Sequence, residues 1–170
     1  MGTRNLTVVI KKAKPVVAQY GQWDGYPSGQ GATVLNFLKS TDLAAFEKKL
    51  EKVHFINEDD QLNINLLMES IGSKDGWMNS EQAEKYKAAY PCLSRDHGAK
   101  VLKLIRDAPE KESIILNDST AFAADSLFCE WAYIINLDTR QLEVYGWNNP
   151  EAGFENTFEK LAKDPEYRKS

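Results

Sequence analysis

Two pairs of β-rich segments, one near each end of the chain, constrain the fold more than any other feature of the sequence. Near the N-terminus, Leu6–Ile10 and Val16–Gln22 are separated by a short polar connection, which is typical of a hairpin. Near the other end, the aromatic and β-branched run Leu127–Leu137 is followed by a short turn and by Gln141–Tyr145, which alternates polar and apolar residues. That alternation predicts one solvated face. We therefore expect two antiparallel hairpins.

The segment between the hairpins is predicted to be mainly helical. Thr41 is the expected N-cap of one helix, and Asn79 to Gln82 resembles a capping box ahead of a helix that ends at Ala89. Ser94 is the expected cap of a later helix, and Ser113–Leu116 is a candidate short strand. The apolar positions at helical spacing are Val34, Leu35, Leu38, Leu43, Phe46, Leu50, Val53, Leu62, Leu66, Val101, Leu102 and Ile105.

The order of these segments predicts the fold class. Hairpin, helices, hairpin and a last helix from Pro150 lack the strict strand–helix alternation of a parallel sheet. We expect a single α+β domain over residues 1–170, with an antiparallel sheet of four or five strands and helices packed on it. The charged end, Lys163 to Ser170, is expected to fray.

Composition excludes several classes of function. A net charge of −4 argues against a general nucleic-acid surface. The sequence has no apolar run long enough for a membrane span and no secretory signal, so a cytoplasmic location is expected. Cys92 and Cys129 are interpreted as reduced, buried thiols, and with only His54 and His97 in addition, no metal site is predicted. No cofactor is predicted either, and the oligomeric state stays open.

The loop from Trp23 to Gly31 is the main candidate site. Gly21 to Gly31 contains four glycines and a proline and leads into a helix, whose N-terminus favours anions. Antiparallel register places Arg4 near this loop, and Arg is well suited to bind phosphate or carboxylate. Asp24 is the candidate catalytic group. The candidate ligand-binding residues are Thr3, Arg4, Tyr20, Gln22, Trp23, Tyr26, Ser28 and Glu130. The same residues are equally compatible with turn chemistry and an aromatic cover for the sheet edge.

Glu130 is expected to belong to the same site. Strand alternation places it on an apolar face with Phe128, Ala132 and Ile134. A carboxylate there needs a partner, and Arg4 is the expected one.

These segments resemble a family of small proteins of uncharacterised activity found in phages, bacteria and fungi. The resemblance covers the opening Met1-Gly2-Thr3-Arg4, the loop Trp23 to Gly29 and the late run Leu127 to Tyr145, and it leaves the helical middle unmatched. Many relatives carry His where this chain has Gln22. The resemblance implies that any reaction dependent on that His would be impaired here.

Two functions from different classes follow. The first is binding of a small anionic ligand of nucleotide type, with its hydrolysis left open, in which aromatic rings stack on the base and Arg4 and the loop amides hold phosphate. The family resemblance makes a phage protein that counters host immune signalling an attractive case. The alternative is an acidic inhibitor or adaptor that uses its aromatic surface on a protein partner. A concave aromatic cluster would favour the ligand, and an exposed one the protein partner.

Overall fold

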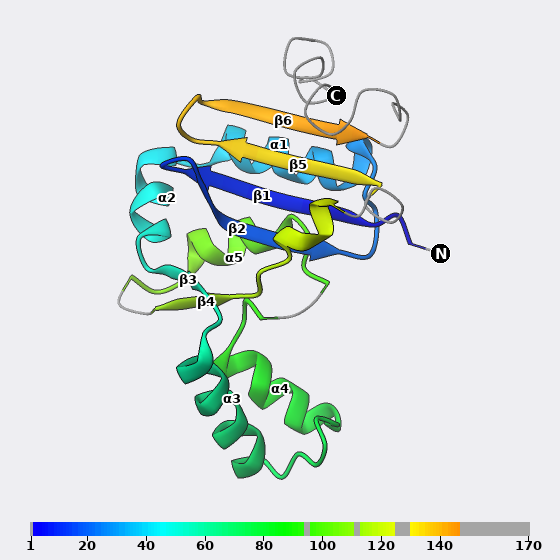
Figure 1. Ribbon diagram of the computed structural model, residues 1–170, viewed down its shortest axis with the longest axis vertical. Helices are drawn as coiled ribbons and strands as arrows, with labels where there is room; N and C mark the ends of the chain where they lie inside the picture. Colours follow the sequence, from blue (N-terminus) through cyan, green and yellow to red (C-terminus); the bar gives the residue numbers. More distant parts are fainter. Residues whose placement is uncertain (1, 94–95, 111–112, 125–129, 147–170) are drawn as a thin grey trace.

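The computed structural model describes residues 2–93, 96–110, 113–124 and 130–146. Its main sheet has four strands in the order β2-β1-β5-β6 (Figure 1). These strands are β1 (Asn5–Lys11), β2 (Lys14–Gly21), β5 (Trp131–Asn136) and β6 (Gln141–Gly146). The N-terminal and C-terminal hairpins are both antiparallel, as the sequence predicts.

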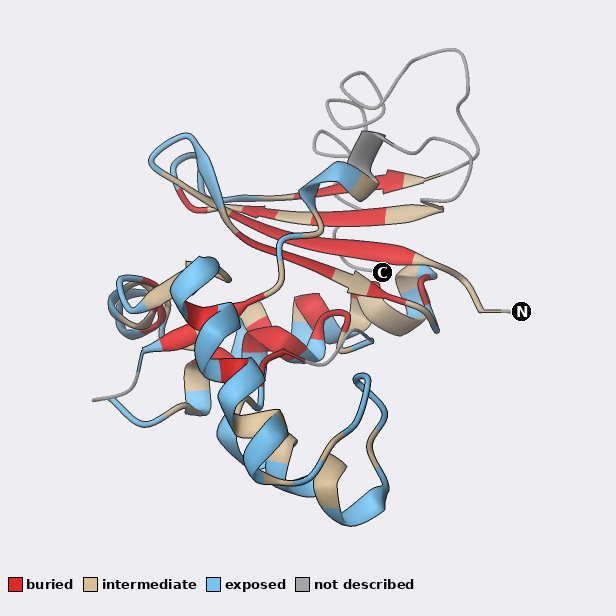
Figure 2. Cartoon of the chain, turned by 60° about the horizontal axis from the view of Figure 1, so that its bottom comes forward, coloured by how far each residue is buried: buried red, intermediate tan, exposed pale blue. Residues whose placement is uncertain are grey.

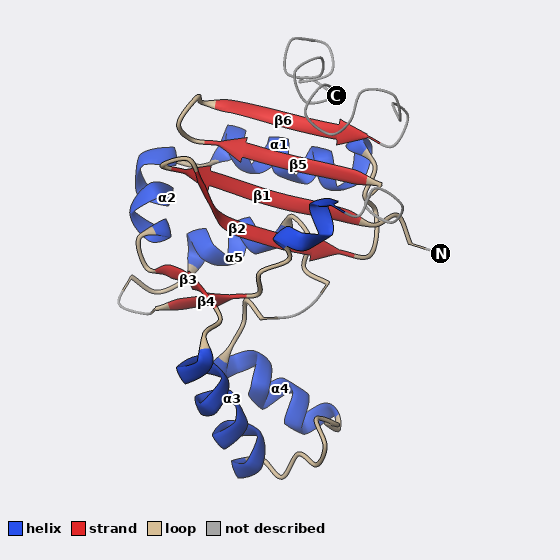
Figure 3. Cartoon of the chain, viewed as in Figure 1, coloured by secondary structure: helices blue, strands red, loops and turns tan. Residues whose placement is uncertain are grey.

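The two hairpins meet along a parallel pair, so the expectation of a wholly antiparallel sheet is wrong. β1 lies beside β5 with Asn5 opposite Trp131 and Val9 opposite Ile135. Parallel strands require a long crossover connection. Here the helical segment supplies it, because it returns the chain to the end of the sheet where β1 begins (Figure 3).

Three helices cover one face of the sheet, and a short helix lies on the other. The first face carries α1 (Ala32–Ser40), α2 (Leu43–Leu50) and α5 (Lys100–Asp107); in Figure 1, α1 and α5 lie behind the sheet and α2 lies at its left edge. The opposite face carries the 3-10 helix η2 (Thr120–Ala124). Buried residues between the sheet and the three helices include Val9, Val17, Val34, Phe37, Phe46, Val101, Leu102, Ile105, Tyr133, Ile135 and Val144. A smaller core on the η2 side contains Leu6, Val8, Ala18, Ala132 and Tyr145.

The predicted second helix is shorter than the apolar stripe suggested. Its N-cap is Asp42 rather than Thr41, because the Asp42 carboxylate accepts hydrogen bonds from Ala44 N and Ala45 N. Val53 is not on this helix but in β3 (Val53–Phe55). β3 pairs in parallel with β4 (Ile114–Leu116), the short strand that the sequence predicts.

Helices α3 (Glu58–Ser70) and α4 (Ser80–Ala89) project from the body of the molecule as an arm (Figures 1 and 2). A capping box joins Asn79 and Gln82 at the start of α4, as predicted. The predicted stripe on α3 is wrong. Leu62 and Leu66 are 61% and 63% exposed, and Ile64 is the apolar residue that α3 buries.

The prediction for α5 is right about its buried face and wrong about where the helix begins. The inner face predicted for α5 is confirmed, since Val101, Leu102 and Ile105 are fully buried. This helix begins at Lys100 after Ala99, so it does not start at Ser94, which itself lies outside the described residues. Cys129, the helix expected from Pro150 and the charged end also lie outside them.

The solvated face predicted for the last strand is only partly present. Gln141 is exposed, but Glu143 is only 4% exposed and Tyr145 only 8%. Both faces of β6 are therefore buried at its centre. Among the described residues, no helix has the length and apolar character needed to cross a membrane.

Candidate functional site

The loop between β2 and α1 is anchored by a buried asparagine. Asn5 is fully buried, and its Nδ2 donates to Gly21 O at 3.1 Å and to Trp23 O at 3.2 Å. The same group lies 3.3 Å from Thr3 O. One side chain of β1 thus ties the end of β2, the loop and the N-terminal segment together.

Two more side chains fix the loop, Tyr133 from the core and Gln30 from within the loop itself. Tyr133 Oη donates to Gly25 O at 2.6 Å, and Gly25 N donates to Thr3 O at 3.0 Å. A Cβ on Gly25 would lie 2.5 Å from Thr3 O, so this close approach requires glycine. Gln30 Nε2 donates to Trp23 O at 3.2 Å, and Gln30 Oε1 accepts from Ala99 N at 2.8 Å. The loop is therefore rigidly built.

The loop amides serve this construction rather than a ligand. Gly29 N and Gly31 N both donate to Tyr26 O, at 2.9 and 3.3 Å, and Gln30 N donates to Asp24 O at 2.8 Å. Together with Gly25 N, four amides of the loop have acceptors within the chain. The π-helical turn η1 (Pro27–Gly31) leads directly into α1. A phosphate at this position could not use those four amides.

The aromatic side chains of the loop face solvent. Trp23 is 60% exposed and Tyr26 is 55% exposed. Asp24 and Ser28 are also exposed, and Asp24 has a left-handed backbone with φ of 57°. In the part of the chain that the structure describes, nothing donates a hydrogen bond to the Asp24 carboxylate.

The remaining predicted site residues gather around the same loop. Asn5 lies opposite Gly21 in the β1–β2 register, which puts Arg4 beside the loop as expected. A Cβ on Gly2 would lie 2.8 Å from Trp23 Cε3, so the N-terminal segment packs on this indole. Tyr20 Oη also donates to Gln22 Oε1. We call Gly2–Arg4 together with Trp23–Tyr26 the N-terminal corner.

Glu130 joins the N-terminal corner through the backbone of its predicted partner. Its Oε2 accepts from Arg4 N at 2.9 Å, and the side chain is half-buried. The sequence therefore predicted that Glu130 pairs with Arg4. It did not predict the donor, which is the backbone N–H of Arg4 and not the expected guanidinium. This carboxylate bonds the start of β1 to the chain just before β5.

Sequence reasoning missed the residues that build the loop. Asn5, Gln30 and Tyr133 were not singled out, although a polar Asn within a β-branched strand is a usable signal for a buried anchor. Phe122 of η2 was missed as well, and its ring packs edge-on against Tyr20 with centroids 5.0 Å apart. Within the described residues, no group of three or more His, Cys, Asp or Glu side chains could hold a metal ion.

Comparison with models of protein families, with curated proteins and with solved structures gave no match.

Proposed function

We propose that this chain is a binding protein that recognises a protein partner through its N-terminal corner. The observation that carries the proposal is the pair of exposed rings, Trp23 at 60% and Tyr26 at 55%, on a loop fixed by buried side chains. Aromatic residues on a preorganised loop supply large contact areas at a low cost in conformational entropy. This is the pattern of interface hot spots, where Trp and Tyr dominate the binding energy.

The engaged amides support a protein partner over a phosphorylated ligand. Four backbone N–H groups that would hold a phosphate already donate within the loop. A protein interface needs no such cradle, because ring burial and polar contacts at the rim supply its affinity.

The test compares the exposed rings of the N-terminal corner with Trp77, an exposed ring on the arm. Photo-crosslinking residues placed at Tyr26 and, separately, at Trp77 identify the partner, which should be captured only from Tyr26.

With the purified partner, Trp23→Ala should weaken binding by about 2 kcal/mol or more, which is roughly thirtyfold in Kd. Trp77→Ala is the matched control, because this ring is 74% exposed but lies on the arm. Equal loss from both variants would contradict the proposal.

A nucleotide-type ligand is the second candidate for the N-terminal corner. It is favoured by the position of Arg4, whose segment packs on the Trp23 indole, so that one corner offers both a guanidinium and a ring. In this case Arg4→Ala should reduce binding about tenfold to a hundredfold, as expected for a charge-assisted contact. Calorimetry with mono-, di- and cyclic nucleotides measures this. A wild-type chain that binds none of them ends this candidate.

Asp24 decides whether such a ligand would also be hydrolysed. If Asp24 acts as a general base, Asp24→Asn should lower turnover about a hundredfold while binding is retained. If it only shapes the loop, turnover by the wild-type chain should be absent and binding should change modestly. Product analysis with the same nucleotides separates these outcomes.

A further inference from the structure

A pocket of about 280 Å³ lies away from the N-terminal corner, between the end of α4, the end of α5 and β4. Its walls are mostly apolar and include Tyr90, Leu104, Ala108 and Ile114. One wall is formed by Ser113, an exposed residue immediately before β4. The pocket therefore combines an apolar space with an accessible hydroxyl.

Ser113 is hydrogen-bonded to a histidine that is itself held by a carboxylate. Ser113 Oγ lies 3.2 Å from His54 Nδ1, and His54 Nε2 lies 2.8 Å from Asp60 Oδ2. His54 is in the centre of β3, opposite Ile115 of β4, so the parallel strands bring the hydroxyl and the imidazole together. Figure 1 shows β3 and β4 side by side, with α3 beginning below them.

The carboxylate is fixed in place by the start of α3. Asp60 Oδ2 also accepts from Asn57 N at 3.0 Å, and Asn57 Oδ1 accepts from Asp60 N at 2.8 Å, which completes a capping box. The Asp60 side chain is only 12% exposed, whereas that of His54 is 37% exposed. A buried, oriented carboxylate thus supports an imidazole that can reach solvent.

The hydrogen bonds assign a role to each nitrogen of His54. An ionised carboxylate only accepts, so Asp60 selects the tautomer with a proton on Nε2. Nδ1 then presents its lone pair to the Ser113 hydroxyl, which donates. A hydroxyl bonded to an oriented imidazole is the arrangement that activates a serine nucleophile.

We propose that Ser113 and His54 are catalytic residues of an acyl-transfer site, with Asp60 as the positioning residue, and that its substrates are esters with short apolar acyl chains that fit the pocket. In serine proteases the serine is bonded to Nε2 and the carboxylate to Nδ1. In this chain Ser113 is bonded to Nδ1 of His54 and Asp60 to Nε2. Both nitrogens lie in the ring plane, so either one can act as the base.

The reaction proceeds in two balanced steps. Ser113 Oγ attacks the ester carbonyl carbon while His54 Nδ1 takes its proton, and the alcohol leaves with that proton as the ester C–O bond breaks. Water then attacks the acyl-serine and gives a proton to Nδ1. The carboxylic acid leaves, and Ser113 Oγ regains the proton.

Cys92 lines the same pocket but does not compete as the nucleophile. It is 4% exposed, and burial raises the pKa of its thiol. The thiolate is the reactive form, so a buried cysteine of raised pKa is inert. The hydroxyl is therefore the reactive group of this pocket.

The first experiment uses a fluorophosphonate probe, which forms a P–O bond to an activated serine as fluoride leaves. Peptide mapping of the labelled full-length chain should place the probe on Ser113. Ser113→Ala should remove the label, and Ser40→Ala is the matched control on an exposed helix end. Absence of label on Ser113, or label that survives Ser113→Ala, would overturn the proposal.

The second experiment separates catalysis from folding. His54→Gln retains a hydrogen-bonding side chain but cannot act as a base, so labelling should slow about a hundredfold or more. With p-nitrophenyl butyrate, Asp60→Asn should lower kcat at least tenfold and leave KM within about twofold. Asp42→Asn makes the same change at the N-cap of α2, outside this site, so its kcat should stay near that of the wild type. An equal loss of kcat in Asp60→Asn and Asp42→Asn would reduce Asp60 to a helix cap and overturn its assigned role.

Discussion

Glu143 in β6 is a carboxylate in an environment that disfavours its charge. The residue is 4% exposed, and burial raises the pKa of its carboxyl from 4.5 to about 7. Among the residues that the structure describes, Glu143 Oε2 has no hydrogen-bond partner. Folding is therefore coupled to retention of a proton at this position.

This coupling predicts a stability that falls as pH rises. Below pH 4.5 the carboxyl is protonated in both states and its contribution is fully present. Between pH 4.5 and about 7 the unfolded chain ionises while the folded chain resists, so up to about 3 kcal/mol is lost. Glu143→Gln should differ from the wild type by less than about 1 kcal/mol at pH 5 and exceed its stability by up to about 3 kcal/mol at pH 8. Urea unfolding at both pH values measures this.

The exposed Glu84 of α4 provides the control for this comparison. Glu84→Gln should leave the difference between pH 5 and pH 8 as it is in the wild type. Parallel pH profiles for the wild type and Glu143→Gln would show that Glu143 is not the source of the effect.

At the scale of single residues, the sequence predicted which positions meet better than how buried they are. Antiparallel register correctly brought Arg4 to the loop, and Glu130 was correctly paired with Arg4. Glu143 was assigned to a solvated face, because alternation distinguishes the two faces of a strand but cannot tell whether the second face is covered. The Ser113–His54–Asp60 arrangement went unnoticed, because Ser113 is 59 residues from His54 in the sequence and meets it only through the β3–β4 pair.

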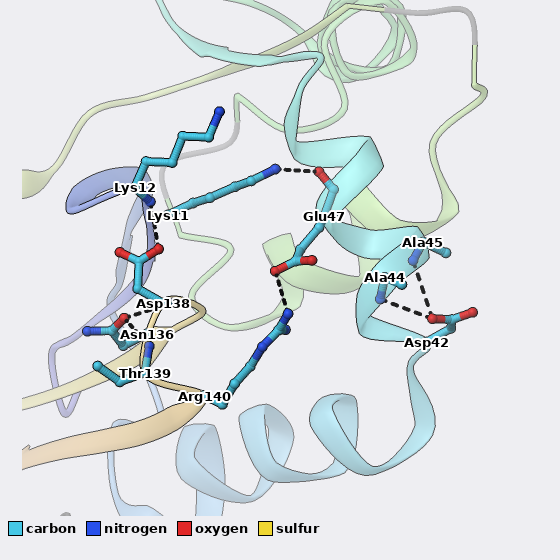
Figure 4. Close-up of polar contacts among 10 residues, drawn as sticks. All are labelled: Lys11, Lys12, Asp42, Ala44, Ala45, Glu47, Asn136, Asp138, Thr139 and Arg140. Atoms are coloured by element: carbon cyan, nitrogen blue, oxygen red, sulfur yellow. Dashed lines mark hydrogen bonds and ion pairs between the residues drawn. The ribbon is translucent and has the colours of Figure 1, made fainter.

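The two hairpins of the sheet are linked at their turns. Lys12 and Ala13 form the two-residue turn between β1 and β2, and both have left-handed backbones, with φ of 54° and 60°. Their N–H groups donate to Asp138 of the other hairpin turn at 2.8 and 2.7 Å, and these bonds lower the pKa of Asp138. Figure 4 shows the bond from Lys12. Arg140 of the same turn pairs with Glu47 of α2 at 3.1 Å.

The β1–β2 turn should gain stability from residues suited to positive φ. Lys and Ala pay about 1 kcal/mol each in the left-handed region, and Asn-Gly is the preferred pair for such a turn. The double substitution Lys12→Asn, Ala13→Gly should therefore raise the free energy of unfolding by about 1–2 kcal/mol, because the backbone bonds to Asp138 are retained. Thermal and urea unfolding measure the change.

A glycine in an ordinary helix is the control for the turn. Ala45→Gly in α2 occupies an exposed helical position and should cost about 0.5–1 kcal/mol. If the turn variant is destabilised to a similar extent, the positive φ values are not the source of strain.

At the scale of elements, local signals predicted more than long-range ones. The capping box at Asn79 and both hairpins are set by neighbours in the sequence, and they were predicted correctly. The parallel β1–β5 pair and the strand β3 depend on partners distant in the chain. Val53 continued a helical stripe, yet pairing with Ile114 places it in a strand.

Stability is distributed unevenly over the whole molecule. The strands β1 and β5 are buried from both sides. Their residues Leu6, Val9, Ala132 and Tyr133 are all 0% exposed. In the arm, α3 buries only Asp60 and Ile64, and α4 has no buried residue. Local opening requires least free energy where few apolar contacts must be broken.

Hydrogen exchange should therefore separate the arm from the body. Amides of α4 and of the second half of α3 should exchange through local opening, at free energies several kcal/mol below those of β1 and β5. Exchange monitored by mass spectrometry under native conditions measures this. Equal protection in the arm and the central sheet would mean that the molecule opens only as one unit.

The two helices of the arm begin at separate caps. Asp60 joins the first turn of α3 to His54 of β3 at 2.8 Å, whereas α4 begins with its own capping box at Asn79. Asp60→Asn should therefore speed exchange in the first turns of α3 and leave the first turn of α4 unchanged. Asn79→Ala should do the reverse, because each helix start depends on its own cap, at about 1 kcal/mol. A change that spreads equally over both helices in either variant would show that the arm opens cooperatively.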